Sequence, residues 1–150
     1  MIDFNQSLQI AKSAALLAGE FLLKAQGGDL KILLNQGRDL KLQLDIDTEK
    51  IIKDYILSHS NYSILGEETG LSDKLGEFFW VIDPLDGTSN FLRGIPISCV
   101  SIALMHELEP VLGVIYDFNH KELYFGHKGS KAFINDQEIQ VSSLSLKNES

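Results

Sequence analysis

The feature that most constrains the fold of this chain is an unbroken apolar run, Phe78–Ile82, that passes directly into the polar segment Asp83–Thr88. A strand with one face in water alternates apolar and polar residues, whereas an unbroken apolar run is typical of a strand buried on both faces. Within the polar segment, Pro84 fixes φ and removes an amide donor, and Gly87 permits a tight turn with close approach of a ligand. The sequence therefore predicts an interior strand that ends in a turn suited to binding.

Two helices are predicted before this strand. Apolar residues recur every three or four positions across Phe4–Ala25, which is the pattern of one buried helix face. Residues 30–46 are expected to be extended or irregular, because leucines alternate with polar residues in 40–45 as in a half-buried strand. The second helix is expected to begin after Asp47, which would cap it, and to end near His59.

Short strands are predicted after the second helix. The first is Tyr62–Leu65, which ends at Gly66-Glu67-Glu68. Beyond the apolar run, further strands are expected at Ser98–Met105, Val111–Tyr116, Glu122–Phe125, Ala132–Ile134 and Glu138–Val141. Their close spacing indicates an antiparallel meander. Helices followed by such a meander predict an α+β fold, with two helices packed on a mainly antiparallel sheet. Residues 1–141 are expected to form one domain, followed by a polar tail at 142–150.

Charge and cysteine content limit the possible partners. The chain has 21 acidic and 13 basic residues and a net charge of −8. Nucleic acid binding needs clusters of Lys and Arg, so this balance argues against it, whereas acidic clusters can be neutralised by divalent cations. The amino terminus has no basic region typical of a secretory signal, and no apolar run approaches the roughly 20 residues that span a bilayer. Because Cys99 is the only cysteine, no intrachain disulfide forms, and we expect a reducing, cytoplasmic location.

Acidic residues follow two of the predicted strands. Glu67 and Glu68 follow one strand, and Asp83 and Asp86 follow the next, just before a predicted helical turn at Thr88-Ser89. Free amides at the start of a helix bind phosphate, but carboxylates beside them would repel it. Mg²⁺ between the two removes this conflict, because it binds carboxylates and phosphate oxygens together. Each motif alone is an ordinary loop, whereas the combination predicts metal-assisted phosphate chemistry.

The string WVIDPLDGTSNF, preceded by GEE and followed by ISCVSIAL, resembles the signature of the inositol monophosphatase family. The similarity extends from the first helix to the strand at Ile139–Val141, and its DPLDGT core is the most specific part. It implies the amino-terminal half of the layered inositol monophosphatase/fructose-1,6-bisphosphatase-like fold, with the carboxy-terminal domain absent. It also implies a Mg²⁺-dependent, lithium-sensitive phosphatase for inositol monophosphate or a related small phosphate, which forms a homodimer in its complete form. This 150-residue chain alone is expected to have low activity.

The resemblance also implies the metal ligands. Glu67, Asp83 and the backbone carbonyl of Leu85 would bind a first Mg²⁺, and Glu67 would also be a catalytic residue. Asp83 would bridge to a second ion that Asp86 also holds. Glu68 is expected to point away from the ions, because adjacent residues of a strand face opposite sides.

Substrate and water would be bound by the residues that follow. The resemblance implies that Asp86 and the amides of Gly87 and Thr88 bind the phosphorylated substrate. The Thr88 hydroxyl, paired with Asp47, would orient and help deprotonate a water that attacks phosphorus directly, with no phosphoenzyme. The segment before Asp47 departs from the family pattern, so Asp47 is alternatively only a helix cap and Asp45 the catalytic carboxylate.

Three other functions share parts of this sequence pattern, and the spacing of the two aspartates argues against one of them. Within the superfamily, the chain alternatively belongs to the 3′(2′),5′-bisphosphate nucleotidase or the fructose-1,6-bisphosphatase branch. A haloacid-dehalogenase-type phosphatase needs two aspartates one residue apart, whereas Asp83 and Asp86 are separated by Pro84 and Leu85. The third alternative is a non-catalytic module that binds metal and phosphate, which the absence of the second half makes plausible.

Overall fold

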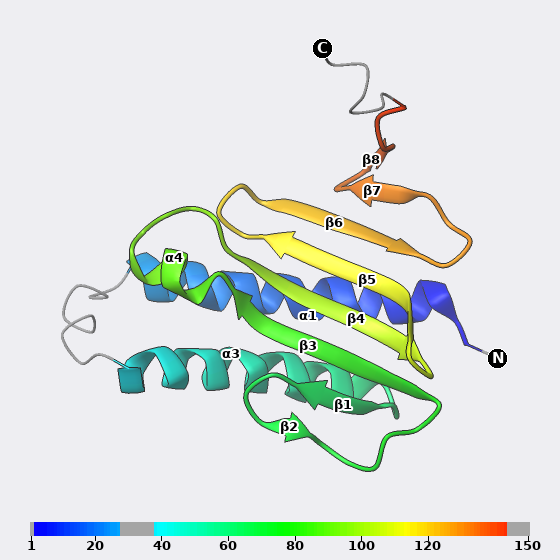
Figure 1. The fold of residues 1–150 in the computed structure, drawn as a ribbon, viewed down its shortest axis with the longest axis horizontal. Helices are drawn as coiled ribbons and strands as arrows, with labels where there is room; N and C mark the ends of the chain where they lie inside the picture. Colours follow the sequence, from blue (N-terminus) through cyan, green and yellow to red (C-terminus); the bar gives the residue numbers. More distant parts are fainter. Residues whose placement is uncertain (1, 28–37, 144–150) are drawn as a thin grey trace.

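The computed structural model describes residues 2–27 and 38–143. Two long helices, α1 (Phe4–Gly27) and α3 (Arg38–His59), lie side by side against one face of a single sheet (Figure 1). A short helix, α4 (Thr88–Leu92), follows the central strand. This arrangement is the predicted α+β fold of two helices on a mainly antiparallel sheet. Among the described residues, no helix is long and apolar enough to cross a membrane.

The sheet has eight strands in the order β2-β1-β3-β4-β5-β6-β7-β8. The strands are β1 (Ser63–Gly66), β2 (Gly70–Leu71), β3 (Phe78–Asp86), β4 (Cys99–His106), β5 (Glu109–Asp117), β6 (Glu122–His127), β7 (Ala132–Ile134) and β8 (Gln137–Ile139). From β3 to β8 each strand pairs antiparallel with the next, as the close turn spacing predicted. The exception is β1, which runs parallel to β3 and brings the ends of these two strands to one edge.

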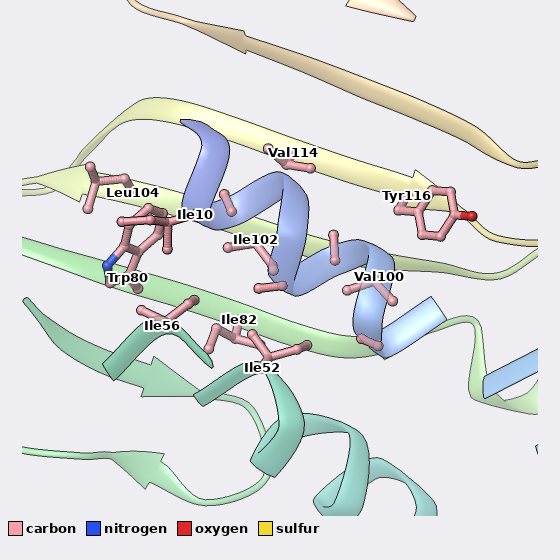
Figure 2. Packing of buried hydrophobic residues seen from close by; sticks show 14 of the residues in the cluster. Ile10, Ile52, Ile56, Trp80, Ile82, Val100, Ile102, Leu104, Val114 and Tyr116 are labelled. Carbon is pink, nitrogen blue, oxygen red and sulfur yellow. The ribbon is translucent and has the colours of Figure 1, made fainter. Parts of the chain in front are cut away.

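The core lies between the helices and the sheet. Alternate side chains of the central strands face the helices and are fully or almost fully buried, including Trp80, Ile82, Val100, Ile102, Leu104 and Val114 (Figure 2). From α1 they meet a row of alanines and Leu22, and from α3 they meet Ile52 and Ile56. Because alanine side chains end at Cβ, α1 can lie close to the sheet. Gly19 continues this row, since an added Cβ there would overlap the ring of Tyr116.

The predicted start of the second helix is wrong. Residues 38–46 are helical rather than extended, so Asp47 lies inside α3 and does not cap it. The part of the prediction that concerns residues 30–37 falls outside the described residues. The error has a physical cause: the first half of α3 buries the polar side chains of Asp45, Thr48 and Glu49, so an apolar 3.6-residue period is absent there.

Candidate active site

Parallel pairing of β1 and β3 brings the two acidic motifs together. Gly66 is the register partner of Ile82, and the Glu67 amide donates a hydrogen bond of 3.2 Å to the Ile82 carbonyl. The residues that follow these partners, Glu67 and Asp83, therefore emerge next to each other. Both strands point toward the end of the sheet where α4 lies (Figure 1). The ends of parallel strands are a common place for binding sites in sheets.

A β-bulge in β3 places Asp83 and Asp86 on the same face of the sheet. Residues three apart on a regular strand face opposite sides. Here Asp83 pairs with Ser101 and Asp86 pairs with Cys99, so three steps along β3 match two steps along β4. The extra residue reverses the alternation, which is how bulges redirect side chains near functional sites. Sequence reasoning missed the bulge, although Pro84 was a signal for it, because proline is tolerated at bulges.

The three carboxylates interact electrostatically. Burial raises the pKa of Asp83 to about 7, together with its hydrogen bond to Glu67 and the negative charges of Glu67 and Asp86. The Leu85 amide donates to Asp83 Oδ1 at 3.1 Å, and this hydrogen bond by itself lowers the pKa of Asp83. Glu67 and Asp86 are exposed, whereas Asp83 is half-buried. A divalent cation would relieve this repulsion, so the chemistry of the donor set fits Mg²⁺.

The positions of the three carboxylates do not by themselves form a complete metal site. Across residues 2–27 and 38–143, no three His, Cys, Asp or Glu side chains form a group that could hold a metal ion. The predicted ligand set of Glu67, Asp83, Asp86 and the Leu85 carbonyl combines three side chains with one backbone group. The structure brings the three carboxylates near one another, and their roles as ligands stay a prediction.

Gly87 connects the carboxylates to the first turn of α4. It has φ of 82°, in the left-handed region, and an added Cβ would lie 2.7 Å from the Ile97 carbonyl oxygen. The helical bonding of α4 begins with the Asn90 amide, which donates to the Gly87 carbonyl at 2.8 Å. Amides at the start of a helix have no acceptor within the helix. The predicted helical turn at Thr88-Ser89 is therefore confirmed, with its first amides beside Asp86.

The predicted pair of Thr88 and Asp47 is not formed. The Thr88 hydroxyl donates its single proton to the Leu85 carbonyl at 2.9 Å. Asp47 Oδ1 instead accepts a hydrogen bond of 2.8 Å from Gln43 within α3. Asp45 differs from Asp47 in environment, because it is only 3% exposed on the buried face of the helix. The catalytic roles of Thr88, Asp45 and Asp47 all stay predictions.

Glu49 is a site residue that sequence reasoning missed. It is fully buried on α3, and its carboxylate accepts hydrogen bonds from the amides of Glu68 and Thr69 at 2.8 and 3.2 Å. Burial by itself raises the pKa of Glu49, but hydrogen bonds from Thr69 and Glu68 and the charge of Lys53 outweigh it and lower that pKa. Glu49 follows Asp45 by four residues and precedes Ile52 by three, which places all three on one helix face. This spacing could have predicted a buried Glu49 if polar residues had been accepted on a buried face.

A hollow of 390 Å³ lies beside Asp86, the last residue of β3. Its lining includes Asp86, Gly87, Asn90, Asp117 and His120. Carboxylate, amide and imidazole groups in one hollow can hydrogen-bond a ligand rich in hydroxyl groups. The sequence did not predict this hollow, because Asp117 and His120 reach it only through the pairing of β4 with β5.

Comparisons with known proteins agree with this geometry. The profile of the inositol monophosphatase family matches residues 3–150. A protein of Aquifex aeolicus, named fructose-1,6-bisphosphatase/inositol-1-monophosphatase, is 37% identical over 145 residues, which cover 94% of this chain and 54% of that protein. Inositol monophosphatase 3 of Solanum lycopersicum is 37% identical over 150 residues, with coverage of 94% and 54%. The solved inositol monophosphatase of Anabaena (Nostoc) superposes with a TM-score of 0.79 at 38% identity, covering 96% of this chain and 52% of that one.

The extent of these matches defines what is shared. The chain spans about half the length of the curated relatives it matches. The matched residues 3–150 of this chain include the two long helices, the central strands and the acidic motifs at Glu67 and Asp83–Thr88. The match over residues 3–150, on a sheet that brings these motifs to one edge, shows that the chain belongs to the inositol monophosphatase family.

Proposed function

We propose that this chain carries the metal- and phosphate-binding half of a Mg²⁺-dependent phosphomonoester hydrolase that acts on inositol monophosphate or a related small phosphate. One observation carries the proposal: Glu67, Asp83 and Asp86 gather at one edge of the sheet, directly before the first turn of α4. Carboxylates without a cation would repel a phosphate, whereas the amides of α4 favour it. A cation-assisted phosphate site reconciles these two features.

The residues that would hold Mg²⁺ are Glu67, Asp83, Asp86 and the carbonyl of Leu85. All are oxygen donors, which Mg²⁺ prefers. Bound Mg²⁺ would supply a Lewis acid for phosphate oxygens and would make a water molecule more acidic. The Leu85 carbonyl is already oriented by the Thr88 hydroxyl, which donates to it at 2.9 Å.

Thr88 and Asp45 are our candidates for orienting water. While its proton is given to the Leu85 carbonyl, the Thr88 hydroxyl oxygen keeps lone pairs that can accept a hydrogen bond from water. Asp45 is preferred over Asp47 as the proton acceptor because it lies one turn before Glu49 on the same buried face of α3. Glu49 in turn contacts the residues that follow Glu67, which places this helix face toward the acidic motif.

The proposed substrate class is supported by the hollow next to Asp86. Asn90, Asp117 and His120 line it and offer hydrogen bonds to hydroxyl groups of an inositol or a sugar. The amides of Gly87 and Thr88 would hold the phosphate at its edge. A sugar bisphosphate is the second candidate substrate, favoured by the name of the Aquifex aeolicus relative. Lithium inhibition and a homodimer belong to the proposal for the complete form, as does the absence of nucleic acid and membrane partners.

Phosphate release from a panel of esters tests the proposal, measured with this chain and with any longer natural form of the protein. The panel contains inositol monophosphate, fructose 1,6-bisphosphate and a nucleoside 3′,5′-bisphosphate, each with Mg²⁺ and with excess chelator. The Anabaena inositol monophosphatase serves as the positive control, and Asp83→Asn serves as the matched inactive variant. Release that requires Mg²⁺ and Asp83 supports the proposal. Full activity in chelator contradicts it, metal binding without turnover favours the non-catalytic module, and a phosphoenzyme on Asp83 indicates a dehalogenase-type mechanism.

A further inference from the structure

Glu49 is buried between α3 and the turn that carries Glu67. Its side chain is fully buried, and each carboxylate oxygen accepts a hydrogen bond from a backbone amide of the turn. Oε2 accepts from Glu68 at 2.8 Å, and Oε1 accepts from Thr69 at 3.2 Å. The Thr69 hydroxyl also donates to Oε1. One carboxylate of α3 therefore binds the turn through three donors of two consecutive residues.

Gly66 makes room for this carboxylate. A Cβ added at Gly66 would overlap both carboxylate oxygens of Glu49. Because Gly66 ends β1, the Glu49 side chain can reach past the strand to the amides beyond it. The contact between α3 and the turn thus depends on a glycine directly before Glu67.

Lys53 balances the charge and binds the far side of the same turn. Its ammonium forms an ion pair of 3.0 Å with Glu49, one helical turn away, and its side chain is only 13% exposed. The same ammonium contacts the Thr69 hydroxyl and lies 3.4 Å from the Gly70 carbonyl. A buried carboxylate is costly unless it is paired and hydrogen-bonded, and here both conditions are met.

We infer that Glu49 is a positioning residue, which holds the 66–69 turn so that Glu67 stays beside Asp83. When both are ionised, Glu67 and Asp83 repel each other unless a cation lies between them, and an anchor on the opposite side of the turn opposes this repulsion. The anchor on the β3 side is the Glu67 amide bonded to the Ile82 carbonyl, and Glu49 supplies the anchor on the α3 side. The functional consequence rests on the proposed function above: without Glu49, the metal would have to order Glu67 itself and would bind more weakly.

The first experiment compares Glu49→Gln with Asp54→Asn in the same 150-residue chain. The glutamine side chain keeps the shape of the glutamate but points an amide donor at one of the backbone donors of the turn. Asp54 lies on the same helix in an exposed ion pair with Lys50, so its neutralisation controls for lost charge. Without metal, the amides of Glu67, Glu68 and Thr69 should exchange with solvent faster in Glu49→Gln only.

The second readout is Mg²⁺ affinity, measured by calorimetry on the same three proteins. Loss of a group that orients a metal ligand typically weakens metal binding about 10- to 100-fold, and we expect a loss of about tenfold for Glu49→Gln. Asp54→Asn should match the unmodified chain. A lower melting temperature with unchanged Mg²⁺ affinity would show that Glu49 only stabilises the fold, and would overturn the inference.

Variants of Thr69 keep the inference testable if Glu49→Gln does not fold. Thr69 is exposed, and Thr69→Val removes the hydroxyl that donates to Glu49 and accepts from Lys53, whereas Thr69→Ser retains it. We expect weaker Mg²⁺ binding, by about threefold, in Thr69→Val and normal binding in Thr69→Ser. Equal affinities for these two variants would contradict the role of the Glu49 contact.

Failure of this inference can be distinguished from failure of the proposed function. If the unmodified chain binds no Mg²⁺, the metal proposal fails, and the amide exchange of Glu67 alone decides the positioning role. Faster exchange at Glu67 in Glu49→Gln then supports the anchor. Unchanged exchange at Glu67 shows that the turn is held without Glu49, whatever the metal result.

Discussion

The two long helices bury very different side chains against the same sheet. The face of α1 that meets the sheet is apolar: four alanines and Leu22 have no exposed area, and Leu8 and Ile10 are at most 9% exposed. Among the α3 side chains whose burial the structure describes, those buried before Ile52 are Asp45, Thr48 and Glu49, which are at most 3% exposed, whereas Ile52 and Ile56 are apolar. Burial of polar groups costs free energy unless they are hydrogen-bonded. The polar part of the α3 face therefore stabilises the fold less than the apolar face of α1 does. We interpret α1 as a packing helix and α3 as the helix that organises the candidate site.

This difference predicts that substitutions near the site reduce activity without reducing the stability of the fold. The largest effect is expected for Asp83→Asn, which removes the carboxylate between Glu67 and Asp86. Loss of metal assistance removes several kcal/mol of transition-state stabilisation, which corresponds to a rate loss of about a thousandfold or more. The free energy of unfolding of the metal-free chain should not fall, because repulsion is removed. Phosphate release and urea unfolding measure both effects, and a variant that loses stability in proportion to activity would contradict the separation.

The next largest effect should distinguish the two aspartates of α3. If Asp45 is the proton acceptor, Asp45→Asn should slow turnover about 10²- to 10⁴-fold, which is the range for general base catalysis. Asp47→Asn should cost only a few tenths of a kcal/mol of stability, through its bond to Gln43. Steady-state kinetics at saturating Mg²⁺ compares them. The opposite order would restore Asp47 as the catalytic residue.

Substitution in α1 should have the reverse signature, with loss of stability and intact metal binding. Gly19→Ala places a Cβ in the ring of Tyr116, and overpacking of this kind costs about 1–3 kcal/mol. Ser13→Ala on the same helix is the control, because Ser13 is only partly buried and does not belong to the core cluster. Thermal unfolding and Mg²⁺ calorimetry test the pair. Weaker Mg²⁺ binding in folded Gly19→Ala would mean that α1 also shapes the site.

The smallest predicted effect is the pH dependence of the Glu49 anchor. The pKa of Glu49 is lowered in the folded state, so its charged form stabilises the fold above the ordinary Glu value of about 4.3. This contribution is lost as the pH falls through the lowered value. The difference in melting temperature between the unmodified chain and Glu49→Gln should therefore shrink below pH ~4. A difference that stays constant from about pH 7 to about pH 3 would show that Glu49 contributes no charged interaction.

The prediction of the fold succeeded where buried faces are apolar. The first helix, the short strand at β1 and the meander from β4 onward were all predicted, because periodic burial leaves a periodic pattern in the sequence. The start of α3 was missed for the opposite reason, since its buried face is polar from Asp45 to Glu49. The motif Asp83–Thr88 identified the family, but its local sequence did not reveal the bulge that puts Asp83 and Asp86 on one face.

By itself, the amino-acid sequence determined the class of the fold and the acidic motifs of the candidate site. Hydrophobic period and turn residues are local properties, and the acidic motifs are read directly from the chain. The tertiary structure decided which of these residues act together. Parallel pairing of β1 with β3 set Glu67 beside Asp83, and the packing of α3 set Glu49 beneath the turn at 66–69. Such contacts join residues about 20 positions apart, and the free energy that selects them comes from burial of the whole sheet rather than from any local segment.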